Sequence, residues 1–178
     1  MPATANPDTP RIDRLDVTVG GLSRSQLASA LNERGILLNA HAETLLEHDV
    51  FDSSTAQTVT VTERTVAELG FTDGATLSQI LGASQHQNLV LCPAETGPYL
   101  RLALTEQPAS ADSVMSSGRA PAGSLTMATA ALSDDDEYPK GFYLRVVDDA
   151  AWLRGYRCDD EHVWSPDDRF LFRLPEMD

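Results

Sequence analysis

The pattern of apolar and polar positions changes along the chain, from helical spacing near the N-terminus to alternation further on. Apolar residues recur every three or four positions in residues 23–34 and again in residues 39–48. Ser23 and Gln26 have the spacing of a capping box, and Gly35 can end the first segment in a left-handed conformation. The two segments therefore predict two N-terminal helices.

The middle of the chain predicts a mixture of strands and short helices. Residues 57–64 alternate between valine and polar side chains, which is typical of a half-buried strand. Thr65 is positioned to cap a helical turn, and Thr76 opens a second short helix. Residues 99–104 and 125–132 are predicted as further strands.

The last part of the chain is rich in aromatic and β-branched residues. Residues 141–147, 151–158 and 169–174 each have the composition and length of a strand and are separated by short polar connections. This arrangement predicts a three-stranded antiparallel meander. The expected fold class is α+β, with N-terminal helices packed on a mainly antiparallel sheet that includes this C-terminal meander.

The domain organisation follows from length and from two polar stretches. A chain of 178 residues fits one domain. Residues 1–14 contain three prolines and no periodicity, which predicts a flexible tail before a single domain over residues 15–178. Residues 108–124 are dominated by Ala, Ser, Pro and Gly, which indicates a long loop, either mobile or a lid.

The connection between the first two C-terminal strands decides which side chains share a face of the sheet. A two-residue turn at residues 148–149 pairs Leu144 with Leu153. It also pairs Arg145 with Trp152. A three-residue loop would instead place Phe142, Leu144 and Val146 beside Trp152 and Arg154. That would bury a charge among aromatics, at a cost of several kcal/mol unless it found a partner. The even turn gathers a set of rings and guanidinium groups, the aromatic–arginine face: Tyr143, Arg145, Trp152, Arg154 and Tyr156.

The aromatic–arginine face is the first candidate for a binding site. Arg, Trp and Tyr are the residue types enriched at protein-binding hot spots, and guanidinium groups can stack on aromatic rings. The alternative is that the arginines are neutralised internally by the acidic runs at residues 134–137 and 159–161.

The net charge of −14 narrows the choice of partner. The chain has 27 acidic against 13 basic residues, and Lys140 is its single lysine. Such a surface repels nucleic-acid backbones and anionic membranes, so we expect neither as a partner. A protein partner with basic character is favoured. The N-terminal residues lack the apolar stretch of a signal peptide, and no run approaches the roughly 20 apolar residues of a membrane span, so we expect a cytoplasmic protein.

Motifs that carry chemistry are not evident in the sequence. Cys158 is followed closely by three carboxylates, which would raise its pKa, whereas a nucleophilic thiol needs a lowered one. His41 and His48 lack the spacing of a zinc motif, and no phosphate-binding loop or nucleophile elbow is present. We therefore expect no cofactor, no metal and no catalytic residue, and a non-enzymatic role is favoured.

Several segments resemble a group of small bacterial proteins for which no activity is established. The resemblance rests on Gly-Phe-Tyr-Leu-Arg at 141–145, Trp-Leu-Arg-Gly-Tyr at 152–156 and His-Val-Trp-Ser-Pro-Asp-Asp-Arg-Phe at 162–170. Residues 91–101 are similar to the same group. The resemblance implies a bacterial, free-standing domain and transfers no catalytic residue.

Three hypotheses for function result. The first is a non-catalytic interaction protein, of accessory, regulatory or immunity type, that binds a partner on the aromatic–arginine face. The second is a small-ligand binder or enzyme with a pocket between helices and sheet, lined by Cys92, Glu95, Tyr99 and Arg101 and covered by the 108–124 loop. The third is a helix-turn-helix DNA-binding protein formed by the two N-terminal helices, although their acidic residues would face the phosphates.

Overall fold

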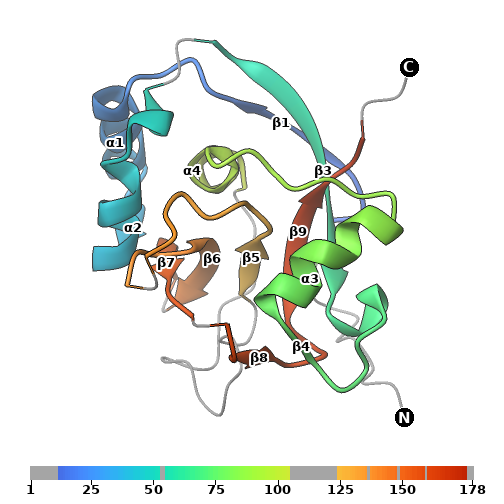
Figure 1. Ribbon diagram of the computed structural model, residues 1–178. Helices are drawn as coiled ribbons and strands as arrows, with labels where there is room; N and C mark the ends of the chain where they lie inside the picture. The colour runs from blue at the N-terminus through green and yellow to red at the C-terminus, as the bar shows by residue number, and fades with distance from the viewer. Residues whose placement is uncertain are drawn as a thin grey trace.

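The protein has an α+β fold, which confirms the predicted class. The computed structural model describes residues 12–52, 55–104, 124–135, 137–147, 149–158 and 160–175. Its helices and strands follow one another as shown in Figure 1: β1 Leu15–Val19, α1 Arg24–Glu33, β2 Leu37–Leu38, α2 Ala40–Leu46, β3 Gln57–Thr65, β4 Ala75–Thr76, α3 Leu77–Ala83, α4 Thr96–Ala103, β5 Leu125–Met127, β6 Gly141–Val147, β7 Ala150–Tyr156, β8 Val163–Trp164 and β9 Arg169–Arg173. Short 3-10 turns occupy Asp49–Phe51, Ala67–Leu69 and Ser84–His86.

The helix starts expected from the sequence are present. At α1 the Ser23 hydroxyl accepts from the Gln26 amide while the Gln26 side chain accepts from the Ser23 amide, which completes the capping box. Thr76 and Gln79 form the same arrangement at α3. Gly35 has a φ of 70°, the left-handed conformation that ends α1. Local side-chain chemistry therefore fixed these boundaries.

The strands form one seven-stranded sheet in the order β1-β3-β9-β5-β6-β7-β2, and β4 pairs with β8 in a small second sheet. The β2–β7 and β5–β9 pairings are parallel, and the others in the large sheet are antiparallel. The predicted three-stranded meander is therefore wrong in one respect. β6 and β7 form its hairpin, but β9 lies between β3 and β5, because β8 leaves the large sheet to pair with β4.

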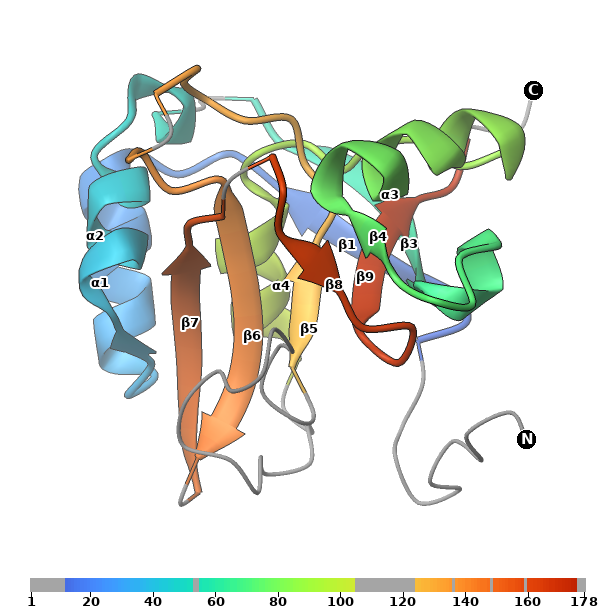
Figure 2. The same cartoon turned by 60° about the horizontal axis from the view of Figure 1, so that its bottom comes forward.

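The large sheet carries a hydrophobic core on each face. One core receives Leu27 and Leu31 from α1, Leu45 from α2 and Leu100 from α4. The other is built under α3 and β8, and its central side chain is Trp164. Figure 2 shows α1 and α2 side by side at the β7 edge and α3 at the far end of the sheet. Both faces of the sheet are thus covered over much of its width.

The segment predicted as a strand at residues 99–104 is helical, and this prediction is wrong. α4 spans Thr96–Ala103, with Pro98 in its first turn, where a missing amide hydrogen costs no helical bond. Residues 96–101 are all buried, because α4 runs between the sheet and α1. A helix buried on every side has no polar stripe, so its pattern resembles that of a buried strand.

The described residues cover the predicted N-terminal tail and the predicted long loop only in part. β1 is a strand that the sequence analysis does not predict, and Ile12, in the region predicted as a tail, packs against the first core. Residues 1–11 and 108–123, which carry the tail and loop predictions, lie outside the described residues. Among the described helices, none has the length and apolar character to cross a membrane.

Candidate functional site

The β6–β7 hairpin has the register predicted from the two-residue turn. Leu144 pairs with Leu153, and Arg145 pairs with Trp152. Val147 and Ala150 are the last pair before the turn, and Asp149 has a φ of 63°. Aspartate tolerates this left-handed conformation better than most residues, which favours a tight turn here.

The aromatic–arginine face is assembled as predicted but is largely covered. Tyr143 and Tyr156 are buried in the second core, and Arg145 has no exposed surface. Trp164 packs edge-to-face on Tyr156, with ring centroids 5.5 Å apart. Three of the five predicted binding residues therefore contribute to packing. The alternation of side chains predicts which residues share a face, but it contains no information on what β8 and α3 bring over that face.

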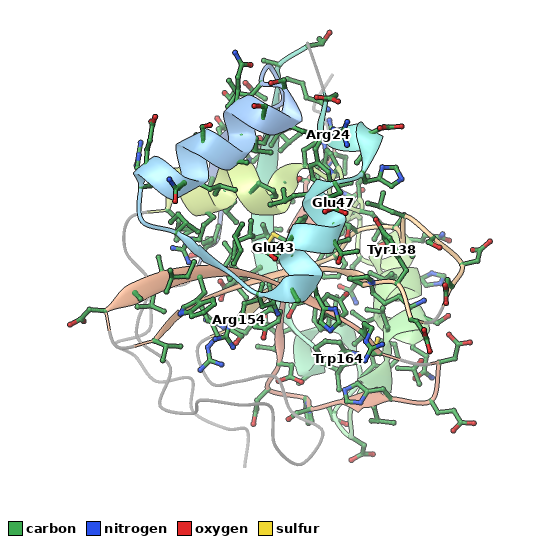
Figure 3. The ribbon with its side chains drawn as sticks, turned by 90° about the vertical axis from the view of Figure 1, so that its left-hand side faces the viewer. Arg24, Glu43, Glu47, Tyr138, Arg154 and Trp164 are labelled. Carbon is green, nitrogen blue, oxygen red and sulfur yellow. The ribbon has the colours of Figure 1, made fainter. Side chains whose placement is uncertain are left out.

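Trp152 and Arg154 are the half-exposed part of the aromatic–arginine face. The Arg154 guanidinium lies 4.2 Å from the centre of the Trp152 ring, the stacked arrangement expected from the sequence. Figure 3 shows Arg154 on the opposite side of the sheet from α2. The half-exposed part of the aromatic–arginine face is therefore one stacked pair and not all five predicted residues.

The residues of the predicted second site do not line one common cavity. Burial raises the pKa of the Cys92 thiol to about 12, and the thiol points to the carbonyl of Leu171 at 3.5 Å. The Tyr99 hydroxyl accepts a hydrogen bond from the Leu22 amide, and burial raises the pKa of this hydroxyl. Burial also raises the pKa of Glu95, which directly precedes α4. Cys92 and Tyr99 are thus structural and do not line the cavity that Arg101 faces.

Arg101 borders a cavity of about 310 Å³, here called the arginine cavity. Its guanidinium donates to the main-chain oxygens of Leu104 at 3.0 Å and Trp152 at 3.5 Å. The cavity lies where the end of α1, the end of α4 and the β6–β7 hairpin meet. Its walls are formed by Arg34, Ile36, Arg101, Leu102, Leu104, Val146, Asp149 and Ala151.

A larger and more open depression, here called the helix groove, lies between α1 and α2. It has a volume of about 590 Å³. Its floor is apolar and its rim carries three carboxylates and one guanidinium. The lining residues are Ser23, Arg24, Ser25, Ala28, Leu38, Glu43, Leu46, Glu47 and Asp52. Figure 3 shows Arg24, Glu43 and Glu47 together on this side of the molecule.

Arg24 closes one end of the helix groove and holds its two helices together. Its Nε donates to Asp52 at 2.8 Å, its amide donates to the same carboxylate at 2.8 Å, and its Nη2 lies 3.7 Å from Asp49. Nη1 donates to the main-chain oxygen of Glu47. These bonds to Arg24 hold the pKa of Asp52 below its usual value. The cation at this end is thus already paired.

Glu43 and Glu47 form the acidic side of the helix groove. Glu43 lies on α2 and Glu47 is its C-cap residue, so the two are four residues apart and share one face of the helix. Both are exposed. Burial, and after it the negative charge of Glu47, raise the pKa of Tyr138. The sequence signal for this site is a pair of glutamates at helical spacing beside apolar positions.

The third hypothesis finds little support in the arrangement of α1 and α2. The helices of a helix-turn-helix unit are joined by a short turn. Here β2 lies between them and pairs with β7, and α2 packs along β7. α2 is therefore fixed to the sheet edge, with acidic side chains on its outer face.

In the part of the chain that the structure describes, no three His, Cys, Asp or Glu side chains are grouped as metal ligands. No protein-family model matches the chain, and neither a curated protein nor a solved structure matches it.

Proposed function

We propose that this chain is a non-catalytic interaction protein that binds a basic amphipathic helix of a partner protein in the helix groove. The observation that carries the proposal is the combination of an apolar floor with an acidic rim in one open depression. It keeps the partner-binding role expected from the sequence but moves the site from the aromatic–arginine face to α1 and α2.

The floor of the helix groove supplies the apolar contact. Leu38 and Leu46 are half-buried, and Ala28 is exposed on α1. A volume of about 590 Å³ lies within the range of pockets that hold small molecules or anchoring side chains, about 300–1,000 Å³. Apolar side chains at positions i, i+3 or i+4 and i+7 of a partner helix fit such a groove between two helices.

The rim determines the charge of the partner. Glu43, Glu47 and Asp52 outnumber Arg24, whose guanidinium is already engaged by Asp52. Lysine or arginine flanking the apolar stripe of a partner helix would therefore be attracted, and the net charge of −14 would speed the encounter. A second copy of this chain would place one acidic rim against another, so self-association through the groove is disfavoured.

The test is a titration of the full chain with a fluorescently labelled leucine–lysine helix, followed by anisotropy. We expect saturable binding that weakens as salt is raised. Replacing Glu43 and Glu47 together by glutamine should weaken it about tenfold at low ionic strength. Glu33→Gln, an exposed charge at the end of α1 outside the groove, is the matched control and should leave the affinity unchanged.

A second pair of variants separates the groove from general charge attraction. Ala28→Arg places a long cationic side chain in the groove, whereas Ser29→Arg adds the same charge on the neighbouring exposed position. The first should abolish binding and the second should change it less than twofold. Equal effects of the two, or equal binding of a peptide with the same residues in scrambled order, would contradict the proposal. Binding of small organic cations with no binding of the helix would do the same.

A further inference from the structure

The arginine cavity is a second depression, independent of the helix groove, with walls of a different chemistry. It places two guanidinium groups, Arg34 and Arg101, beside one carboxylate, Asp149, in a protein whose net charge is −14. The remaining wall is aliphatic, formed by Ile36, Leu102, Leu104, Val146 and Ala151. The described residues of the cavity wall are thus cationic in sum and about half apolar.

Arg101 is held in place at the cavity wall. It is 2 % exposed, and its bonds to the carbonyls of Leu104 and Trp152 connect the end of α4 to β7. Burial lowers its pKa, but a guanidinium stays charged at neutral pH. A fixed, desolvated cation binds an anion more strongly than a solvated one, because its interactions are less screened.

Arg34 brings the second guanidinium to the same place. It caps the end of α1, and its Nη1 donates to the main-chain oxygen of Leu102 at 3.3 Å. It is exposed, so it can move toward a ligand without disturbing the core. Guanidinium groups present parallel donors that match the two oxygens of a carboxylate.

We propose that the arginine cavity binds a small organic carboxylate, with the carboxylate at Arg34 and Arg101 and an apolar body against the aliphatic wall. A volume of about 310 Å³ suits a ligand of a few carbon atoms. A phosphate group fits less well, because it carries about −1.5 to −2 charges and Asp149 would repel it. The aliphatic wall would also leave its oxygens without donors.

The experiment is an amide NMR titration of the full chain with acetate, butyrate and hexanoate, with inorganic phosphate and hexylamine as comparison ligands. We expect saturable shifts at residues that line the cavity, and affinity that rises by up to about fourfold per added methylene until the cavity is filled. Phosphate and hexylamine should bind at least tenfold more weakly than hexanoate.

Variants make the assignment specific. Arg34→Gln, at an exposed position, should weaken hexanoate binding about tenfold, while Arg157→Gln, an exposed arginine outside the cavity, should not. Asp149→Asn keeps a residue that tolerates the left-handed turn and removes the like charge, so it should strengthen binding severalfold. Equal binding of hexanoate and hexylamine, stronger binding of phosphate, absence of saturable shifts, or an unchanged affinity in Arg34→Gln would overturn the proposal.

Discussion

The side chain of Asn39 is hydrogen-bonded to both main-chain groups of Gly155, 116 residues further along the chain. Asn39 Oδ1 accepts from the Gly155 amide at 2.9 Å, and Nδ2 donates to the Gly155 carbonyl at 3.0 Å. The same Oδ1 accepts from the Ala42 amide at 2.9 Å and so caps α2. One amide group thus starts α2 and fixes it to the outer part of the sheet, which sets one wall of the helix groove.

Replacing Asn39 by alanine should therefore destabilise the fold by about 2–4 kcal/mol, since a cap and two hydrogen bonds to a buried strand residue are lost. Asn39→Asp keeps the acceptor and loses the donor to the Gly155 carbonyl, so this variant should also be substantially less stable than the native chain. Denaturant unfolding monitored by circular dichroism measures both. If Asn39→Ala lost less than about 0.5 kcal/mol, the link between α2 and β7 would not have the role described.

Gly155 should not tolerate a side chain, because α2 lies directly against it. A Cβ at this position would lie 2.7 Å from the main-chain carbon of His41 and 2.9 Å from the amide nitrogen of Ala42. Gly155→Ala should cost more than about 2 kcal/mol, since main-chain atoms must shift. Gly82→Ala is the matched control: it lies in α3 with open space around it, and should stabilise by about 0.5–1 kcal/mol. Equal effects of the two changes in thermal melting would contradict this packing.

Glu63 and Arg169 form a buried ion pair across the β3–β9 pairing, with Arg169 Nη1 3.1 Å from Glu63 Oε1. The Glu63 side chain is 3 % exposed. Removing one charge leaves the other buried, so Glu63→Leu and Arg169→Met should each cost about 3–5 kcal/mol. The double variant should be much less destabilised than the sum. Additive losses in this double-mutant cycle would show that the two groups are not coupled.

Cys92 should react with thiol reagents only after unfolding. Its folded pKa is raised by burial from 9.0 to about 12, so the unfolded chain releases this proton first as pH rises. The contribution of the neutral thiol to stability is therefore complete below about pH 9 and is lost between pH 9 and the folded pKa. Urea unfolding from pH 7.5 to 10.5 should show a smaller loss of stability for Cys92→Ala than for the native chain. Labelling of Cys92 in the folded protein as fast as in urea would be inconsistent with its burial.

The sequence correctly predicts the structural features that depend on residues only a few positions apart. The capping box at Ser23, the helix start at Thr76 and the two-residue turn before Ala150 are examples, because each depends on residues a few positions apart. The pattern of α4 resembles that of a strand, because burial of residues 96–101 removes the periodicity that identifies a surface helix.

The exposure of the aromatic–arginine face depended on long-range contacts. Tyr143 and Tyr156 share the predicted face, but Trp164 covers it from β8, a segment that no local pattern connects to it. The helix groove has the same origin: Leu38 and Leu46 come together because β2 and α2 both pack on β7, and Ala28 joins them from α1, which packs on α4. Sequence spacing within α2 indicated the acidic rim but not the apolar floor beside it.

The most direct measurement of the central claim is an amide NMR map of the full chain with an unlabelled leucine–lysine helix. The account predicts saturable shifts in α1, β2 and α2, centred on residues around Ala28 and Glu43, and none in α3. Those shifts should disappear in Ala28→Arg and persist in Ser29→Arg. Shifts spread evenly over the acidic surface, or centred on Trp152 and Arg154, would contradict it.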